Sequence, residues 1–284
     1  MKRPKKRYWT WQALIRDILG RFRLSPVDRT EIKEIGLFSW TKLRLSKPGL
    51  LVRVKVRGYS IRIRSGTPDL EVALTSLSGE FEDLRGLLPA EYAGKVLDVG
   101  GYIGTATLAL RRIFPIAEII CIEPSTENMK VLKLNLKGHK NISVVNAALV
   151  GSARETANLF DRGTGEWGFT LVEDATSSKS GNFLNSVRAM TLSDFGVGTD
   201  DVGIIKLDIE GGEFEVMKFD APHLQMIPVI FAELHDDVVP GCSSEFFKMS
   251  SNRELVHFSG EKWLSLRKDL RPPSSGGSRP KEAA

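Results

Sequence analysis

Acidic side chains and one histidine stand where several short apolar runs of the sequence end. Asp98, Glu123 and Asp208 lie at the ends of three such runs, and Glu233 and His235 lie at the end of a fourth. Carboxylates can accept hydrogen bonds from hydroxyl or amino groups, and a histidine with a pKa near neutrality can accept a proton. If the runs are parallel strands, these side chains meet at one edge of a sheet, where ligands bind.

The glycines that follow Asp98 indicate what the ligand is. Residues 95–109, KVLDVGGYIGTATLA, predict a buried strand, a glycine turn and a helix, the opening unit of a nucleotide-binding sheet. A carboxylate at Asp98, two residues before Gly100, would oppose the pyrophosphate of a dinucleotide. S-adenosylmethionine (SAM) has a sulfonium, an amino group and free ribose hydroxyls, so it meets no such repulsion. The stretch favours SAM over NAD; a turn that serves packing alone is the alternative.

Two further strand ends would complete a cofactor site. Glu123 ends the second strand, 19 residues after Gly104, where an acid can accept both ribose hydroxyls. Asn146 and Ala147 end the third strand, and the Asn146 side chain could meet the adenine edge. The alternatives are a surface carboxylate at Glu123 and a turn-forming asparagine at Asn146.

The stretch KLDIEGGE, residues 206–213, carries three acids next to a buried strand. Strand alternation puts Lys206 and Asp208 on one side, so we expect them to pair. Glu210 and Glu213 fall at the turn into a helix, where carboxylates suit the helix N-terminus. A purely structural role, as cap and ion pair, is the alternative.

A proton acceptor is expected at the end of the last core strand. Glu233 and His235 flank Leu234 and should point to one side, so we predict His235 as the base, oriented by Glu233, with Asp208 in reserve. A carboxylate–histidine cluster with Asp208 could instead bind a divalent cation, although an oxygen-rich Mg²⁺ site would not favour the histidine. A hydrogen-bonded histidine at a strand end is the third possibility, and no metal site is assigned.

Composition limits the class of protein. The 284 residues are 42% hydrophobic with a net charge of +5, enough for one large α/β domain and an accessory segment. Cys121 and Cys242 lie far apart without a CxxC spacing, so we expect a reducing cytoplasm and no disulfide framework. No apolar run reaches the length of a membrane span, and no secretion signal is evident.

Residues 1–40 form a basic N-terminal segment. An amphipathic helix is expected over residues 10–23, with Trp11, Leu14 and Ile18 on its apolar stripe. Residues 1–29 could dock on an anionic membrane surface, which would place the protein at the inner membrane surface. The alternative is a surface helix packed on the domain.

Residues 41–94 are expected to form a β-hairpin and a helical lead-in to the main domain. Within residues 50–64 apolar and basic residues alternate, which predicts a hairpin that turns near Gly58–Tyr59, with one apolar and one basic face. The basic face could hold an anionic glycan or could simply be solvated. Nucleic acid is not an expected partner, because only Tyr59 could supply a stacking ring.

Strands and helices alternate over residues 95–270, which predicts an α/β fold with a mostly parallel sheet flanked by helices. Residues 67–87 are expected to be helical, and Ser125 is expected to cap the helix after the second strand. Residues 151–187 are polar and rich in glycine and serine, so we expect a long irregular insertion with short strands over the active site. Residues 271–284 are expected to be a disordered tail. The expected strands after the first are residues 119–122, 142–145, 202–207 and 229–234, with a last strand or pair within 254–268.

The chain resembles the FkbM family of SAM-dependent methyltransferases. The resemblance covers about residues 64–235, in family order, and the DIEGGE and AELH stretches are its most specific parts. The matching stretches are RSGTPDLEV (64–72), KVLDVGGYIGTATLAL (95–110), IEPSTENMKVLKLNL (122–136), ISVVNAAL (142–149), MTLSDF (190–195), IIKLDIEGGEFEVMK (204–218) and IFAELH (230–235).

The resemblance implies a Rossmann-like class I methyltransferase fold, extended here by the N-terminal helix and hairpin. It also implies SAM as methyl donor, held by Asp98, Gly100, Gly101, Tyr102, Gly104, Glu123, Asn146 and Ala147. Gly101-Tyr102 departs from the Ala-Asn usual in the family. From the resemblance we expect an O-methyltransferase that acts on a hydroxyl of a sugar, glycan or secondary metabolite. A SAM- or glycan-binding module without turnover and an NAD-dependent oxidoreductase are the alternatives.

Overall fold

The computed structural model describes residues 24–163, 165–172 and 181–270. The expected amphipathic helix at 10–23 and the tail at 271–284 lie outside these residues, so membrane docking stays a prediction. Among the described residues, no helix combines the length and the apolar character that a bilayer crossing needs.

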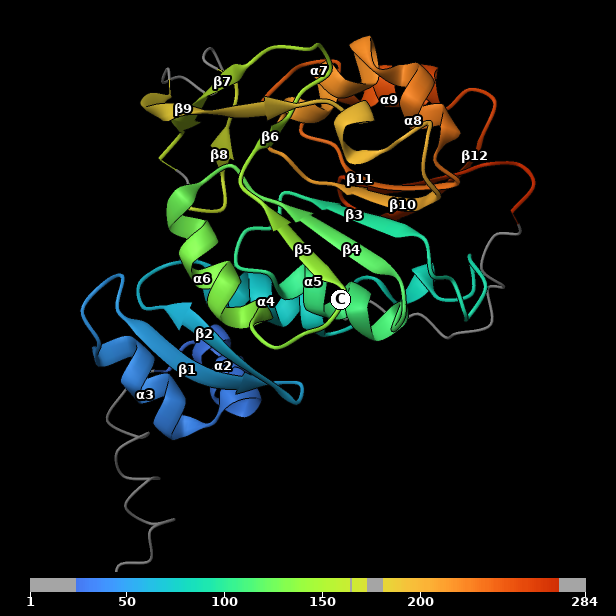
Figure 1. The fold of residues 1–284 in the computed structure, drawn as a ribbon. Helices are drawn as coiled ribbons and strands as arrows, with labels where there is room; N and C mark the ends of the chain where they lie inside the picture. The colour runs from blue at the N-terminus through green and yellow to red at the C-terminus, as the bar shows by residue number, and fades with distance from the viewer. Residues whose placement is uncertain (1–23, 164, 173–180, 271–284) are drawn as a thin grey trace, which may run out of the picture.

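A seven-stranded sheet forms the centre of the molecule, with the strand order β12-β13-β11-β10-β3-β4-β5 (Figure 1). The five strands from β11 to β5 run parallel, and β13 is antiparallel to both of its neighbours. The predicted mostly parallel α/β sheet and its last strand pair are confirmed. The strands are β3 (Lys95–Val99), β4 (Glu118–Ile122), β5 (Ile142–Val145), β10 (Val202–Leu207), β11 (Val229–Glu233), β12 (Glu254–Ser259) and β13 (Lys262–Leu266).

Alternating side chains of the central strands enter two different cores. Val96 and Ile204 belong to the core under α4, α5 and α6, whereas Leu97 and Ile205 belong to the core under α7, α8 and α9. Figure 1 shows these two helix layers on opposite faces of the sheet. Because both faces are covered, β10 is buried along its whole length. The helices are α4 (Asp69–Leu77), α5 (Thr105–Ile113), α6 (Thr126–Leu136), α7 (Gly212–Phe219), α8 (Ala221–Met226) and α9 (Cys242–Met249).

The N-terminal extension packs on the first of these cores. Its helices α2 (Pro26–Ile35) and α3 (Leu37–Leu45) precede the hairpin of β1 (Leu51–Val56) and β2 (Tyr59–Arg64). The hairpin turns at Arg57-Gly58, one residue earlier than expected, with φ of 48° and 92°. Its valines and isoleucines are buried in the same core as α5.

One residue of the hairpin departs from the expected pattern. Strand alternation puts Arg64 on the basic face, but Arg64 is buried. It turns inward because Asp69, at the start of α4, binds its guanidinium from inside.

Two regions differ in detail from the expectation. The helix expected over 67–87 ends at Leu77, because Gly79 takes a φ of 112°, and only the short 3₁₀ helix Glu82–Leu84 follows. The described part of the insertion forms a separate sheet of order β6-β9-β7-β8. Its strands are β6 (Ala148–Leu149), β7 (Thr156–Asp161), β8 (Phe169–Thr170) and β9 (Asn182–Met190).

Candidate functional site

A cavity of about 330 Å³ lies at the carboxyl ends of β3, β4, β10 and β11. The insertion contributes Trp167, Phe169 and Leu171 to its lining, as expected for a segment over the active site. Helix α4 contributes Glu71 and Thr75. A volume of this size suits a small-molecule ligand.

The glycine turn after β3 is locked to the end of β10. Gly100 has a φ of 84°, and a Cβ atom at this position would lie 1.8 Å from the carbonyl oxygen of Asp208. The ammonium group of Lys206 donates to the carbonyl oxygen of Gly100 at 2.9 Å. Any side chain at position 100 would therefore separate the two strand ends.

Packing explains why Gly101 stands where the family usually has alanine. A Cβ atom on Gly101 would lie 2.3 Å from Sγ of the buried Cys121 and 3.0 Å from Cδ1 of Leu132. Alanine therefore does not fit here unless Cys121 or Leu132 changes too. Tyr102 takes a φ of 48°, and its backbone N–H donates to Glu123 at 2.8 Å.

Glu123 presents a fixed carboxylate to the cavity. The amide N–H groups of Tyr102 and Ser125 donate to its two oxygens at 2.8 and 2.9 Å, and the side chain of Asn128 donates at 3.2 Å. Burial raises the pKa of Glu123 to about 7, although these hydrogen bonds act in the opposite direction. Ser125 caps α6 as predicted.

Three residues predicted at the cofactor lie outside the cavity lining: Asp98, Gly104 and Asn146. Asp98 is fully buried beneath the glycine turn, where it accepts from Thr107 and faces Lys206 at 3.5 Å. The Asn146 amide donates to the backbone carbonyls of Glu123 and Pro124 at 2.8 and 2.9 Å, so it ties two strand ends together. Ala147, by contrast, lines the cavity with Gly100, Gly101, Tyr102 and Glu123.

A buried network behind the glycine turn was not anticipated. Asp69 accepts from the guanidinium of Arg64 and from the hydroxyl of Tyr102, and Arg64 also donates to Asn128 at 3.0 Å. The Arg64 guanidinium lies 5.3 Å from the centre of the Tyr102 ring. Arg64 and Asp69 both belong to RSGTPDLEV, but strand alternation placed Arg64 on the exposed face and so did not predict the pair. The second partner, Tyr102, lies 33 residues away from Asp69 and left no local signal.

The acids of the DIEGGE turn each have a cationic partner. The expected pair of Lys206 and Asp208 forms, with 3.1 Å between Nζ and Oδ2. Partial burial opposes ionisation of Asp208, but Lys206 and His235 outweigh it and lower its pKa. Oε2 of the buried Glu210 pairs with Arg162 from the insertion, a partner that sequence spacing could not reveal.

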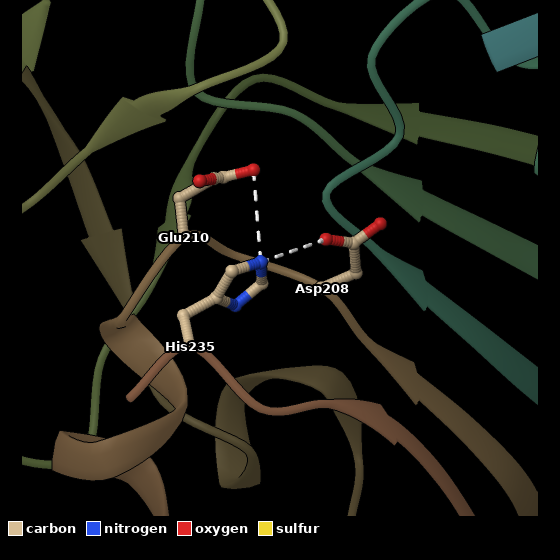
Figure 2. A group of neighbouring side chains, drawn as sticks. All are labelled: Asp208, Glu210 and His235. Atoms are coloured by element: carbon tan, nitrogen blue, oxygen red, sulfur yellow. Dashed lines mark ion pairs between the residues drawn. The ribbon is translucent and has the colours of Figure 1, made fainter. Parts of the chain in front are cut away.

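His235 is oriented by Glu213 and not by Glu233, which corrects the predicted pair. Its Nδ1 lies 3.2 Å from Oε1 of Glu213, while Nε2 faces Glu210 at 3.7 Å and Asp208 at 3.9 Å (Figure 2). The alternation expected after Glu233 does not apply, because β11 ends there.

These carboxylates also change what His235 can do. Burial by itself lowers the pKa of the imidazole, but Glu213, Glu210 and Asp208 together raise it to about 11. At neutral pH such a histidine is already protonated, so it cannot accept a further proton.

Glu233 takes part in a second charged group at the cavity. The ammonium group of Lys262 lies 3.4 Å from its carboxylate and also pairs with Glu80. Burial and the nearby Asp208 raise the pKa of Glu233, and Lys262 opposes the shift. Glu233, Lys262 and Glu80 line the cavity beside α4.

The balance of charge in the cavity lining is strongly acidic. Among the residues that the structure describes, seven carboxylates line it against the two lysines Lys206 and Lys262. The carboxylates are those of Glu71, Glu80, Glu123, Glu166, Asp208, Glu210 and Glu233. This balance favours a ligand with a positive centre and disfavours a pyrophosphate.

The sequence profile of the methyltransferase FkbM domain matches residues 98–243, from the end of β3 to the start of α9. The chain belongs to the FkbM methyltransferase family. The match includes the glycine turn, Glu123, the DIEGGE turn and His235. The suspected family is confirmed, and with it the Rossmann-like class I fold of the sheet.

This FkbM chain is also similar to other known proteins. Methyltransferase 1 of Beauveria bassiana (strain ARSEF 2860) is 28% identical over 162 residues, which are 50% of this chain and 64% of the relative. Precorrin-6y C5,15-methyltransferase of Geobacter metallireducens is 11% identical with a TM-score of 0.38, covering 70% of this chain and 88% of its own. Pyrococcus horikoshii TYW2 in complex with MeSAdo is 13% identical with a TM-score of 0.40, covering 79% and 74%. Similarity at this level does not identify a substrate.

Proposed function

We propose that the protein is a SAM-dependent O-methyltransferase that acts on a hydroxyl of a sugar, glycan or secondary metabolite. The observation that carries the proposal is the acidic cavity, which joins the glycine turn and Glu123 to Asp208. A ligand that bears a sulfonium and ribose hydroxyls matches this lining better than a dinucleotide does.

The residues at the glycine turn fit SAM. Glu123 holds its two oxygens in place through backbone N–H groups, so they can accept the ribose hydroxyls. Gly100 and Gly101 present only backbone atoms to the cavity, because the space that a Cβ atom would need at each is already filled by the protein. When bound, SAM supplies the electrophilic methyl group.

Asp208 is the proposed proton acceptor in place of His235. It is about one-third exposed and lines the cavity next to the glycine turn. Its lowered pKa keeps it ionised, and Lys206 fixes one of its oxygens. The other oxygen can take the proton of an acceptor hydroxyl as that hydroxyl attacks the methyl carbon.

The test is to incubate the protein with SAM and hydroxylated glycans or metabolites, and to measure S-adenosylhomocysteine and products heavier by one CH₂ unit. Asp208→Asn should slow turnover by roughly 10²–10⁴-fold and leave SAM affinity nearly unchanged. Asp200→Asn, the same change two residues before β10 begins and away from the cavity, should have little effect. SAM binding without turnover on any hydroxyl acceptor would favour a binding module, and tighter binding of NADH than of SAM would refute the proposal.

A further inference from the structure

We propose that Asp208, Glu210 and His235 bind one divalent transition-metal cation at the floor of the cavity. One potential ligand atom from each residue lies within 4.8 Å of the other two. Figure 2 shows Nε2 of His235 pointing toward one oxygen of each carboxylate. Two of the ligands come from the DIEGGE turn after β10, and the third comes from the end of β11.

Each carboxylate has one oxygen paired and one directed at the histidine. Asp208 pairs with Lys206 through Oδ2 and leaves Oδ1 toward Nε2 at 3.9 Å. Glu210 pairs with Arg162 through Oε2 and leaves Oε1 toward Nε2 at 3.7 Å. Both separations are too long for a hydrogen bond. Ligand atoms bound to one ion at roughly 2.0–2.2 Å lie roughly 3–4 Å apart, so these separations suit a shared cation.

The histidine is independently fixed for this role. Its side chain is only 7% exposed, and within the described part of the chain no hydrogen bond reaches its Nε2. Its other nitrogen, Nδ1, bonds Glu213, which is itself fully buried and accepts from the backbone N–H groups of Gly211 and Ile209. A carboxylate behind a ligating histidine fixes the ring. The Nε2 proton of His235 is released when the ion binds, because only the neutral imidazole is a ligand.

The ligand set selects the kind of ion. One imidazole and two carboxylates suit ions such as Mn²⁺, Fe²⁺ or Zn²⁺ better than Mg²⁺, which prefers oxygen alone. Because Asp208 and Glu210 line the cavity, a bound ion could contact an acceptor hydroxyl and favour loss of its proton. The ion would then replace Asp208 as the group that activates the hydroxyl, since it occupies the same oxygen, Oδ1. That use rests on the proposed function, whereas the binding itself does not.

The test is a titration of the metal-free, full-length protein with Mn²⁺, followed by electron paramagnetic resonance, and with Zn²⁺, followed by calorimetry. We expect one site per chain, and at least a tenfold loss of affinity in Asp208→Asn, Glu210→Gln and His235→Gln. Glu213→Gln should weaken binding by roughly 10–100-fold, as is typical of residues that orient a ligand. His223→Gln is the matched control, because His223 also pairs with a carboxylate, Asp220, but lies on α8.

Thermal unfolding of each variant distinguishes loss of the cation site from loss of the fold. Asp208→Asn should disturb the fold least, because Asp208 is the most exposed of the three ligands. The proposal is overturned if the unmodified protein binds neither ion at millimolar concentration, with or without SAM, or if all three ligand variants bind like the unmodified protein. Turnover of SAM without cation binding would overturn the site and leave the proposed function intact. Cation binding without turnover would support the site and count against the proposed function.

Discussion

Glu123 should make SAM binding depend on pH. Its pKa is raised to about 7, so the carboxyl group is protonated below that pH and ionised above it. Only the ionised form offers all its lone pairs to the ribose hydroxyls, so SAM affinity should rise as the pH increases from 6 to 8, around that pKa. Calorimetric titration across this range checks the expectation.

The variant Glu123→Gln tests whether Glu123 is the source of this pH dependence. Glu123→Gln should weaken SAM binding by about 1.5–3 kcal/mol at pH 8, the scale of hydrogen bonds to a charged group, and should remove the pH dependence. Glu118→Gln changes the same residue type at the opposite end of β4 and should leave the titration unchanged. A pH dependence that persists in Glu123→Gln would assign it to another group.

The contact between Gly101 and Cys121 predicts a non-additive pair of substitutions. Gly101→Ala alone should destabilise the protein by about 1–3 kcal/mol, because the new methyl group overlaps the sulfur atom. Cys121→Ala removes that sulfur, so the double variant should lose less stability than the two single variants together. Equilibrium unfolding in urea measures all three variants. Strictly additive losses would mean that Leu132, and not Cys121, limits the space.

For single residues, the sequence predicted where a side chain lies better than which residue it binds. The rule that ligands bind at the carboxyl ends of parallel strands placed Glu123 and Asp208 at the cavity, where the structure has them. The predicted pairing of His235 with Glu233 carried strand alternation past the end of β11. The actual partner, Glu213, comes from another strand–helix turn, and such tertiary proximity leaves no local signal.

Strand β2 and helix α4 are held together by a buried ion pair. Removing the charge of Asp69 with Asp69→Asn leaves Arg64 buried without its counter-charge, so we expect a loss of about 3–5 kcal/mol in the free energy of unfolding. Glu34→Gln, which breaks the partly exposed pair with Arg57, should cost about 1 kcal/mol or less. Equal losses in the two variants, measured in the same denaturant titration, would contradict this account.

Periodic elements were the most predictable part of the fold. Continuous apolar runs identified the parallel strands, and period-two alternation identified the hairpin. Short strands were expected in the insertion, but their pairing was not predicted. Strand β9 pairs with both β6 and β7, and no short-range sequence pattern specifies either partner. Arg162 therefore could not be connected to Glu210 in advance.

At the scale of the whole molecule, the part of the chain that matches the family profile is shorter than the part that folds around one core. The match begins at residue 98, yet Val54, Ile61 and Leu77 share one core with Leu108 of α5. A protein that starts at residue 95 would expose that core, so we expect it to lose cooperative unfolding and near-ultraviolet circular dichroism. A protein that starts at residue 24 keeps the core and should unfold cooperatively. Cooperative unfolding of the shorter protein would show that the extension is a separate unit.

The contact between Gly100 and the end of β10 has a consequence for the entropy of the reaction. The Asp208 backbone N–H donates to Val99 at 3.3 Å, and Lys206 holds the Gly100 carbonyl, so the two strand ends form one rigid piece. If the methyl donor binds at one end and the acceptor at the other, their separation is set by the backbone. The conformational entropy lost in aligning the two binding sites is then lost once, when the chain folds, and not again in each catalytic cycle.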